Sequence, residues 1–189
     1  EPMVIVEMNN NLKELQLEEK AEIEAILKSI SQSVGQVARE IQISLKVLRK
    51  FDFIFAKARL SYAMKGIEPK FNTKGFIRLV KGRHPLITGD VVPLDLELGN
   101  KFDSLIITGP NTGGKTVALK TTGLLSLMAQ CGLHIPAAPE TELSLFDQIF
   151  ADIGDEQSIE QSLSTFSSHM KNLVFIVENA TSASLVLLD

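Results

Sequence analysis

The chain has 189 residues with 19 basic and 23 acidic side chains, a formal net charge of −4, one Cys and no Trp. This length exceeds that of a typical single domain and falls short of two full ones, so we expect one domain with an appendage. Apolar residues make up 44% of the chain and charged residues 22%, which is typical of a soluble globular protein and excludes wholesale disorder.

The sequence carries no sign of a membrane or secreted protein. The uncharged stretch over residues 121–138 contains Gly123, Gln130 and Pro136, so it is too polar and too broken to span a bilayer. No basic segment followed by an apolar run and a cleavage site opens the chain, so we expect no secretory signal. The single cysteine, Cys131, excludes an internal disulfide framework and is typical of a reducing compartment. We therefore expect a cytoplasmic protein.

Residues 1–66 carry the pattern of long helices. Apolar side chains recur three or four residues apart in an eleven-residue repeat, the spacing of a stripe along an α-helix: Ile23, Ile26, Ile30, Val34, Val37, Ile41, Leu45 and Leu48. We predict one helix over about residues 10–48, which residues 31–35 could interrupt because helix formers thin out there, and a second over about 51–64. This region is either an amphipathic hairpin packed on the rest of the chain or a lever that leads to other domains.

After Glu68 and Pro69 the sequence changes to short apolar runs separated by turn residues. We predict strands over residues 76–80, 95–98, 104–108, 148–152 and 184–188, and helices over 114–131 and 162–180. Alternating strands and helices with continuous apolar runs indicate an α/β fold whose mixed, partly parallel sheet is covered on both faces. The sequence thus predicts a helical segment over residues 1–66 and an α/β domain over 67–189.

One motif in the α/β part carries specific chemistry. Its residues fit the pattern G-x-x-x-x-G-K-[ST] of a phosphate-binding loop: Gly109, Pro110, Asn111, Thr112, Gly113, Gly114, Lys115 and Thr116. Glycines let the backbone curl around an oxyanion, and the following helix adds the positive end of its dipole. We expect the Lys115 ammonium to reach the β- and γ-phosphates and the Thr116 hydroxyl to coordinate Mg²⁺. The motif predicts a site for ATP or ADP with Mg²⁺, the alternative being a glycine turn beside a surface lysine.

The second half of such a site is an acidic residue at the end of a neighbouring apolar strand, where it holds Mg²⁺ directly or through water. Asp189, which follows the apolar run 185–188, is the candidate. In many ATPases of this kind the next residue is a glutamate that polarises the attacking water. The chain ends at Asp189, so we assign no catalytic residue within it.

The chain resembles the ATPase domain of the MutS family. The resemblance is carried by the loop 109–116 and by three further segments in matching order and spacing: Gly82-Arg83-His84-Pro85-Leu86, Ile149-Phe150-Ala151-Asp152-Ile153-Gly154-Asp155 and Ser164-Thr165-Phe166. Residues 9–15 and 53–59 resemble the second bacterial branch, the MutS-two type. That branch lacks the mismatch-reading domain and usually carries a C-terminal Smr nuclease domain. The resemblance covers essentially the whole chain.

The resemblance implies a partial ABC-type P-loop ATPase domain, preceded by core and lever helices. In that fold two subunits sandwich two nucleotides. It implies that Asn111 helps to place the γ-phosphate, that Val117 continues the loop, and that Ser164 reaches the nucleotide of the partner subunit. It places Val91 and Val92 where the family packs a side chain on the adenine, whereas His84 and Pro85 look like a structural corner.

The resemblance further implies that the parent protein is a homodimer acting on branched or recombination-intermediate DNA, with ribosome rescue in some members. It also implies that regions outside this chain hold the DNA. The composition gives no support for nucleic-acid binding by the C-terminal part, because Lys171 is the only Lys or Arg after Lys120. A small-molecule kinase is an alternative, but no Arg follows the loop. The other alternative is a non-catalytic helical dimerisation or scaffold module with a vestigial nucleotide site.

The end of the chain carries its own expectation. It stops at Asp189 beside a predicted buried strand, which indicates a fragment of a longer protein. Elements that the family places after this residue are missing from the chain. We therefore expect it to bind nucleotide weakly and to hydrolyse it negligibly.

Overall fold

A computed structural model of the chain describes residues 2–110, 113–154 and 162–189. The chain divides into two units, Glu1–Ile54 and Phe55–Asp189, with the boundary inside a helix. We describe each unit by itself. Among the described residues, no helix is both long enough and apolar enough to cross a membrane.

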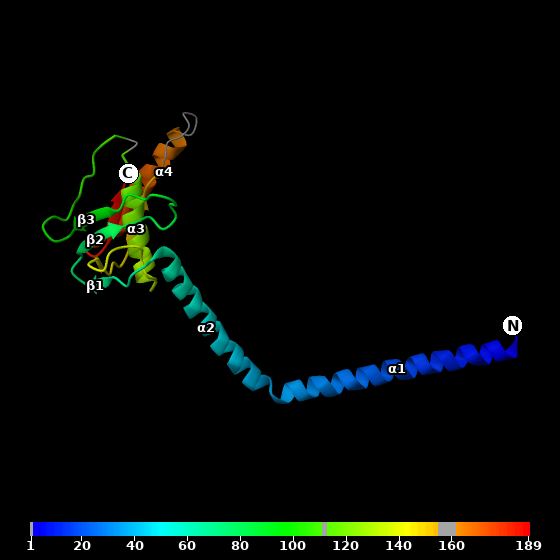
Figure 1. Cartoon of the computed structure of the whole chain (residues 1–189). Coiled ribbons are helices and arrows are strands. Elements are labelled where there is room, and N and C mark those ends of the chain that lie inside the picture. Colours follow the sequence, from blue (N-terminus) through cyan, green and yellow to red (C-terminus); the bar gives the residue numbers. More distant parts are fainter. Residues whose placement is uncertain (1, 111–112, 155–161) are drawn as a thin grey trace. The chain divides into compact units, whose positions relative to one another are not determined.

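Two helices form the N-terminal region, α1 (Met3–Gln36) and α2 (Ala38–Met64) (Figure 1). The helix break lies at Val37, whose φ of −111° and ψ of 16° depart from helical values. The helical region and a break within it are as predicted, but the division into two helices differs. The interruption falls just beyond residues 31–35, and the second predicted helix, 51–64, is the continuation of α2 rather than a separate element. Because no proline marks the break, helix propensity was the only signal for it, and this signal located the break two residues too early.

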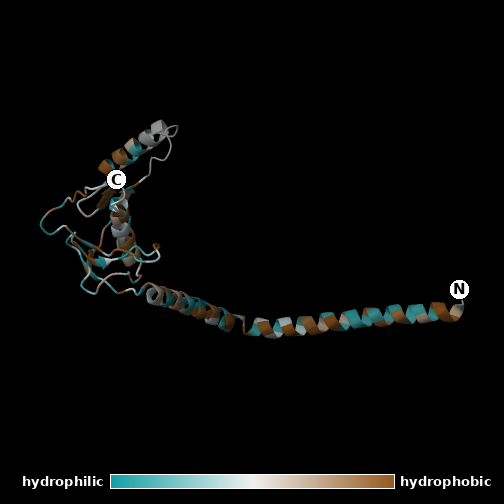
Figure 2. Cartoon of the chain, turned by 45° about the horizontal axis from the view of Figure 1, so that its top comes forward, coloured by the Kyte–Doolittle hydropathy of each residue, from teal (hydrophilic) through white to brown (hydrophobic). Residues whose placement is uncertain are grey.

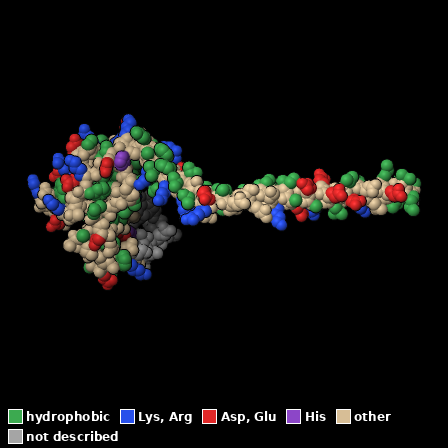
Figure 3. Space-filling model, turned by 90° about the horizontal axis from the view of Figure 1, so that it is seen from below, with side chains coloured by type: hydrophobic (Ala, Val, Ile, Leu, Met, Phe, Trp, Pro, Cys, Tyr) green, Lys and Arg blue, Asp and Glu red, His purple; other side chains and the backbone are tan. Residues whose placement is uncertain are grey.

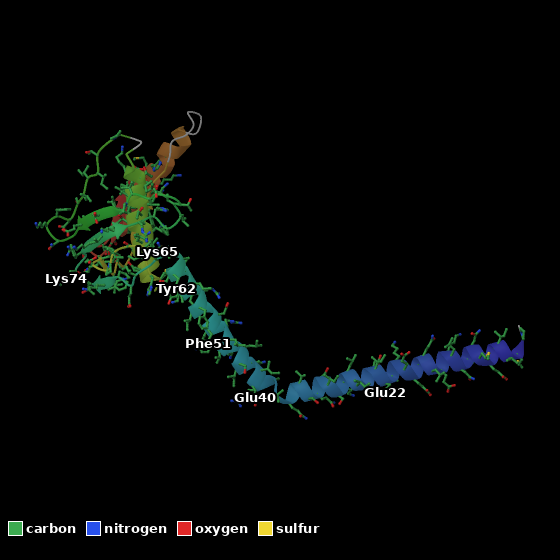
Figure 4. All side chains as sticks on the ribbon, viewed as in Figure 1. Glu22, Glu40, Phe51, Tyr62, Lys65 and Lys74 are labelled. Atoms are coloured by element: carbon green, nitrogen blue, oxygen red, sulfur yellow. The ribbon has the colours of Figure 1, made fainter. Side chains whose placement is uncertain are left out.

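Neither helix buries a residue. The predicted stripe is present in α1, where Ile23, Ile26 and Ile30 are each at least half exposed. Figure 2 shows apolar and polar residues alternating along the helix, and Figure 3 shows acidic and apolar side chains interspersed on it. Side chains such as Glu22 and Glu40 project away from the ribbon in Figure 4. The helical period in the sequence therefore predicted the helix correctly, although none of its side chains is buried.

The second unit contains a four-stranded mixed sheet in the order β1-β4-β2-β3. Its strands are β1 (Lys70–Asn72), β2 (Ile77–Gly82), β3 (Leu94–Leu98) and β4 (Glu142–Ser144). β1 and β4 are parallel, whereas β2 is antiparallel to both β3 and β4. The predicted strands 76–80 and 95–98 are confirmed as β2 and β3. The three-residue strands β1 and β4 were not predicted, because they are too short to show a two-residue period.

A separate parallel pair is formed by β5 (Ile149–Asp152) and β6 (Leu185–Leu188), connected through α4 (Ser162–Asn179). These elements confirm the predicted strands 148–152 and 184–188 and the helix 162–180. Asp152 pairs with Leu188, so the two strands end at the same edge. The α/β class with a mixed sheet is confirmed.

The predicted strand over residues 104–108 is wrong, because the structure gives this segment no regular secondary structure. Ile106 is 85% exposed and Leu105 is 43% exposed. A strand requires a neighbouring backbone to pair with its N–H and C=O groups. Within the described parts of the chain this segment has no strand partner. The apolar run by itself was therefore not sufficient evidence for a strand.

Helix α3 (Lys115–Gln130) packs against β2 and β4 of the first sheet and against β5 and β6 of the second. It corresponds to the predicted helix 114–131. The core between these elements contains Ile77, Leu79, Leu125, Ala129, Ile135, Leu143, Phe146, Leu185 and Leu187. Gly123 lets α3 lie close to β6, because a Cβ at this position would be only 2.6 Å from Leu187 Cδ1. This packing fixes the start of α3 relative to the ends of β5 and β6.

Candidate functional site

The segment that precedes α3 forms a tight glycine-rich bend. Gly109 has a φ of 151° and Gly114 a φ of 78°, values that L side chains rarely adopt. The Gly113 amide donates a hydrogen bond to the Pro110 carbonyl over 2.9 Å. Asn111 and Thr112, predicted to belong to the phosphate-binding loop, lie outside the described residues. The described part of the loop thus turns the chain directly into α3.

Lys115, the first residue of α3, folds back over this bend. Its ammonium Nζ donates to the Gly109 carbonyl at 2.6 Å. Gly114 precedes the helix and supplies no side-chain cap. Because the first N–H groups of a helix have no intrahelical acceptor, the bend combines backbone donors with a nearby positive charge. This is a chemical environment suited to an anion.

The next residue joins the loop to the distant end of the chain. The Thr116 hydroxyl donates to Oδ2 of Asp189 over 2.5 Å. Asp189 directly follows β6, and its amide donates to the Asp152 carbonyl at 3.1 Å, continuing the pairing of β5 with β6. The structure therefore brings together two oxygen-bearing residues that are 73 positions apart in sequence.

These two side chains fit a magnesium ion better than a transition metal. Mg²⁺ prefers hard oxygen ligands and usually keeps several waters, using one or two protein groups plus substrate phosphates. A hydroxyl and a carboxylate in contact beside a glycine-rich bend match that donor set. Over the residues that the structure describes, no group of three or more His, Cys, Asp or Glu side chains could hold a metal by itself.

A polar cluster that the sequence analysis missed lies next to Asp189. Asp152, 7% exposed at the end of β5, accepts a hydrogen bond from His169 Nδ1 at 2.8 Å and one from Asn172 Nδ2 at 3.2 Å. The hydrogen bond from His169 holds the pKa of the Asp152 carboxyl below its ordinary value, although burial acts in the opposite direction. The spacing of His169 and Asn172 on one helix face was the available signal, but their distance in sequence from Asp152 concealed the contact.

The remaining predicted site residues are distributed as follows. Val91 and Val92 line a cleft of about 650 Å³ with residues of the loop 83–93 and the end of α2. Val92 is 87% exposed. In the same loop the His84 imidazole accepts a hydrogen bond from the Leu86 amide at 3.3 Å. Val117 lies in the first turn of α3, whereas Ser164 lies in the first turn of α4 with its side chain outside what the structure describes.

Comparison with known proteins gives a consistent result. Residues 105–189 match the family model described as MutS domain V. Over its whole length the chain is 59% identical to a protein named endonuclease MutS2 from Alkaliphilus metalliredigens and 57% identical to one named putative endonuclease MutS2 from Bacillus subtilis. It spans 24% of the length of each of these relatives. The chain is thus similar to MutS2 proteins over its whole length, and its C-terminal part is similar to MutS domain V.

Proposed function

Given a MutS domain V match over residues 105–189 and MutS2 relatives over the whole chain, we propose that this chain is the nucleotide-binding part of a MutS2-type ATPase. The observation that carries the proposal is the 2.5 Å contact between Thr116 and Asp189. It unites the glycine-rich loop with a carboxylate at a strand end, as an ABC-type P-loop fold would require for Mg²⁺ and nucleotide.

The predicted site residues have the following roles in this proposal. The loop 109–116 and the start of α3 surround the phosphates of ATP or ADP, and Lys115 offsets their charge. Thr116 and Asp189 hold Mg²⁺, which when bound neutralises phosphate oxygens. By resemblance, Asn111 places the γ-phosphate. Residues 91–92 flank the adenine, and Ser164 acts on the nucleotide of a second subunit.

For the longer protein, the proposal extends to work on DNA. Its relatives are named as endonucleases, and the family resemblance points to a homodimer that acts on branched or recombination-intermediate DNA and limits homologous recombination. Ribosome rescue is a further role in this proposal. By the family resemblance, regions outside the chain hold the nucleic acid. The C-terminal part of the chain is a poor candidate, because Lys171 is its only Lys or Arg after Lys120.

Nucleotide binding by the chain tests the proposal directly. Titration calorimetry with ADP and Mg²⁺ should detect binding that Lys115→Ala weakens roughly 10- to 150-fold, which corresponds to a loss of about 1.5–3 kcal/mol for hydrogen bonds to a charged group. Lys120→Ala is the matched control, because Lys120 is an exposed cation on the same helix outside the loop. Equal affinities for the unsubstituted chain and Lys115→Ala would contradict the proposed role of the loop.

A second candidate, a helical dimerisation module, is favoured by a separate observation. α1 has no buried residue and exposes apolar side chains along its length, including Ile23, Ile26 and Ile30. Analytical ultracentrifugation with and without nucleotide separates the candidates. Dimerisation that depends on ADP or ATP supports the ATPase, whereas dimerisation that is independent of nucleotide and unaffected by Lys115→Ala supports the helical module.

A further inference from the structure

Asp152, at the end of β5, bonds both to α4 and to the end of β6 beside the proposed nucleotide site. Its carboxylate accepts hydrogen bonds from two α4 residues, with Oδ2 paired to His169 and Oδ1 paired to Asn172. Because these residues are three positions apart, they lie on the same face of the helix. A buried carboxylate that is bonded on both oxygens holds the helix at a defined distance and rotation.

The backbone of the same residue determines where Asp189 emerges. Asp152 is paired with Leu188 in the parallel ladder, and its carbonyl accepts the hydrogen bond from the Asp189 amide. One residue thus binds α4 through its side chain and the predicted Mg²⁺ ligand through its main chain. The contact from Asp189 to Thr116 continues this path to the loop.

Two neighbouring features show that the space around this cluster is restricted. A Cβ on Gly154 would lie 3.3 Å from Cε1 and 3.4 Å from Nε2 of His169, so a larger residue there would press on the imidazole. Farther along α4, the Phe175 ring packs edge-on against Phe150 of β5, with centroids 6.1 Å apart. α4 therefore has two attachments to β5. The polar attachment is the one beside Asp189.

We propose that Asp152 is a positioning residue of the nucleotide site, which holds α4 against the ends of β5 and β6 and thereby keeps Asp189 within reach of Thr116. Each carboxylate oxygen of Asp152 already accepts a hydrogen bond from α4, so we assign Asp152 a positioning role rather than that of a metal ligand. The inference rests on the proposed function. It adds a residue outside the loop that keeps the nucleotide site in place. Groups that orient metal ligands typically change metal affinity 10- to 100-fold when they are removed.

The test measures ADP affinity in the presence of Mg²⁺ and in EDTA. Asp152→Leu keeps a side chain that branches at Cγ but leaves His169 and Asn172 without an acceptor. It should reduce the Mg²⁺-dependent gain in ADP affinity about 10- to 100-fold, while the affinity in EDTA stays within about twofold. Asp152→Asn should retain most of the gain. Its carbonyl can accept from Asn172, and its amide can donate to the other tautomer of His169.

Asp147→Ala is the matched control at the opposite ends of the same strands. Asp147 also accepts two side-chain hydrogen bonds, from Thr181 at 2.5 Å and Ser184 at 2.8 Å, but it precedes β5. Its replacement should lower thermal stability without changing the Mg²⁺-dependent gain. If Asp152→Leu fails to fold, the double variant His169→Ala with Asn172→Ala removes the same contacts from the α4 side and should show the same loss.

The outcomes separate this inference from the proposed function. Full retention of the Mg²⁺-dependent gain in Asp152→Leu, or in the double variant, overturns the positioning role while ADP binding still supports the proposed function. ADP binding that depends on Lys115 but shows no gain from Mg²⁺ also overturns it. Absence of ADP binding in the unsubstituted chain overturns both. In the ligand-free chain, amide hydrogen exchange at Asp189 should accelerate in Asp152→Leu, and an unchanged rate contradicts the inference.

Discussion

At the scale of single residues, the start of α3 depends on a backbone conformation that favours glycine. Gly114 has a φ of 78° and no atom within 4 Å of the position a Cβ would take, so space is available but the conformation is unfavourable for an L residue. This left-handed conformation connects the glycine-rich bend to the first turn of α3. Replacing Gly114 should therefore strain the backbone at the start of α3, and this strain should also weaken nucleotide binding.

We predict that Gly114→Ala destabilises the chain by about 1–2 kcal/mol and also weakens ADP binding. Gly75→Ala is the control, because Gly75 has a φ of 75° and likewise no atom within 4 Å of a Cβ. It should cost similar stability but leave ADP affinity unchanged. Thermal unfolding and calorimetric titration of both variants make the comparison. Equal effects of the two variants on affinity would show that the conformation of Gly114 has no special role in binding.

At the scale of elements, α3 connects the two sheets while carrying hydroxyl groups into the interior. Thr121, Thr122 and Ser126 are almost completely buried, and each donates to the carbonyl four residues earlier. Their hydrogen bonds are thus satisfied within the helix, which leaves its apolar side chains to form the contacts with the strands. The helix can pack on both sheets without leaving an unpaired polar group.

The packing of α3 yields a second prediction. Leu125 is fully buried in the core, so Leu125→Ala should lower the free energy of unfolding by about 2–5 kcal/mol. Leu127 is 49% exposed on the same helix, and Leu127→Ala should change the free energy of unfolding by no more than about 0.5 kcal/mol. Urea denaturation followed by circular dichroism distinguishes the two. Comparable losses would mean that α3 does not bury the face described here.

At the scale of the whole molecule, stability should reside in the second unit. Every member of the hydrophobic core lies between Ile77 and Leu187, whereas α1 and α2 bury no residue. The last turns of α2 are attached within the second unit by the Ser61 hydroxyl, which lies 2.7 Å from His134 Nδ1, and by Lys57 Nζ, which donates to the Gly132 carbonyl at 3.4 Å.

We therefore predict that a shortened chain of residues 55–189 unfolds within about 4 °C of the full chain, a shift that corresponds to about 1 kcal/mol. Its helical circular dichroism signal should fall, because α1 and the first part of α2 are removed. Differential scanning calorimetry of both chains provides the measurement. A midpoint lowered by more than about 10 °C would show that the helical unit contributes to the core.

Local sequence patterns were enough to predict the α/β class of the fold and to propose a phosphate-binding loop. Local patterns were sufficient for the strands 76–80 and 148–152 and for the helix that begins at Lys115, because alternation, helical period and glycine spacing are properties of neighbouring residues. The motif at 109–116 also placed a lysine and a hydroxyl at the start of a helix. The relatives and the family match support the resemblance that these residues suggested.

Which distant residues are in contact, and which apolar runs pair as strands, could be seen in the three-dimensional structure alone. The segment 104–108 is apolar but finds no strand partner among the described residues, and β1 and β4 exist because their neighbours supply ladder bonds to three-residue segments. Asp152 gained its hydrogen bonds to α4 in the same way, across a gap of at least 17 positions. Such contacts depend on how elements pack in space, and that information is not contained in any one stretch of the chain.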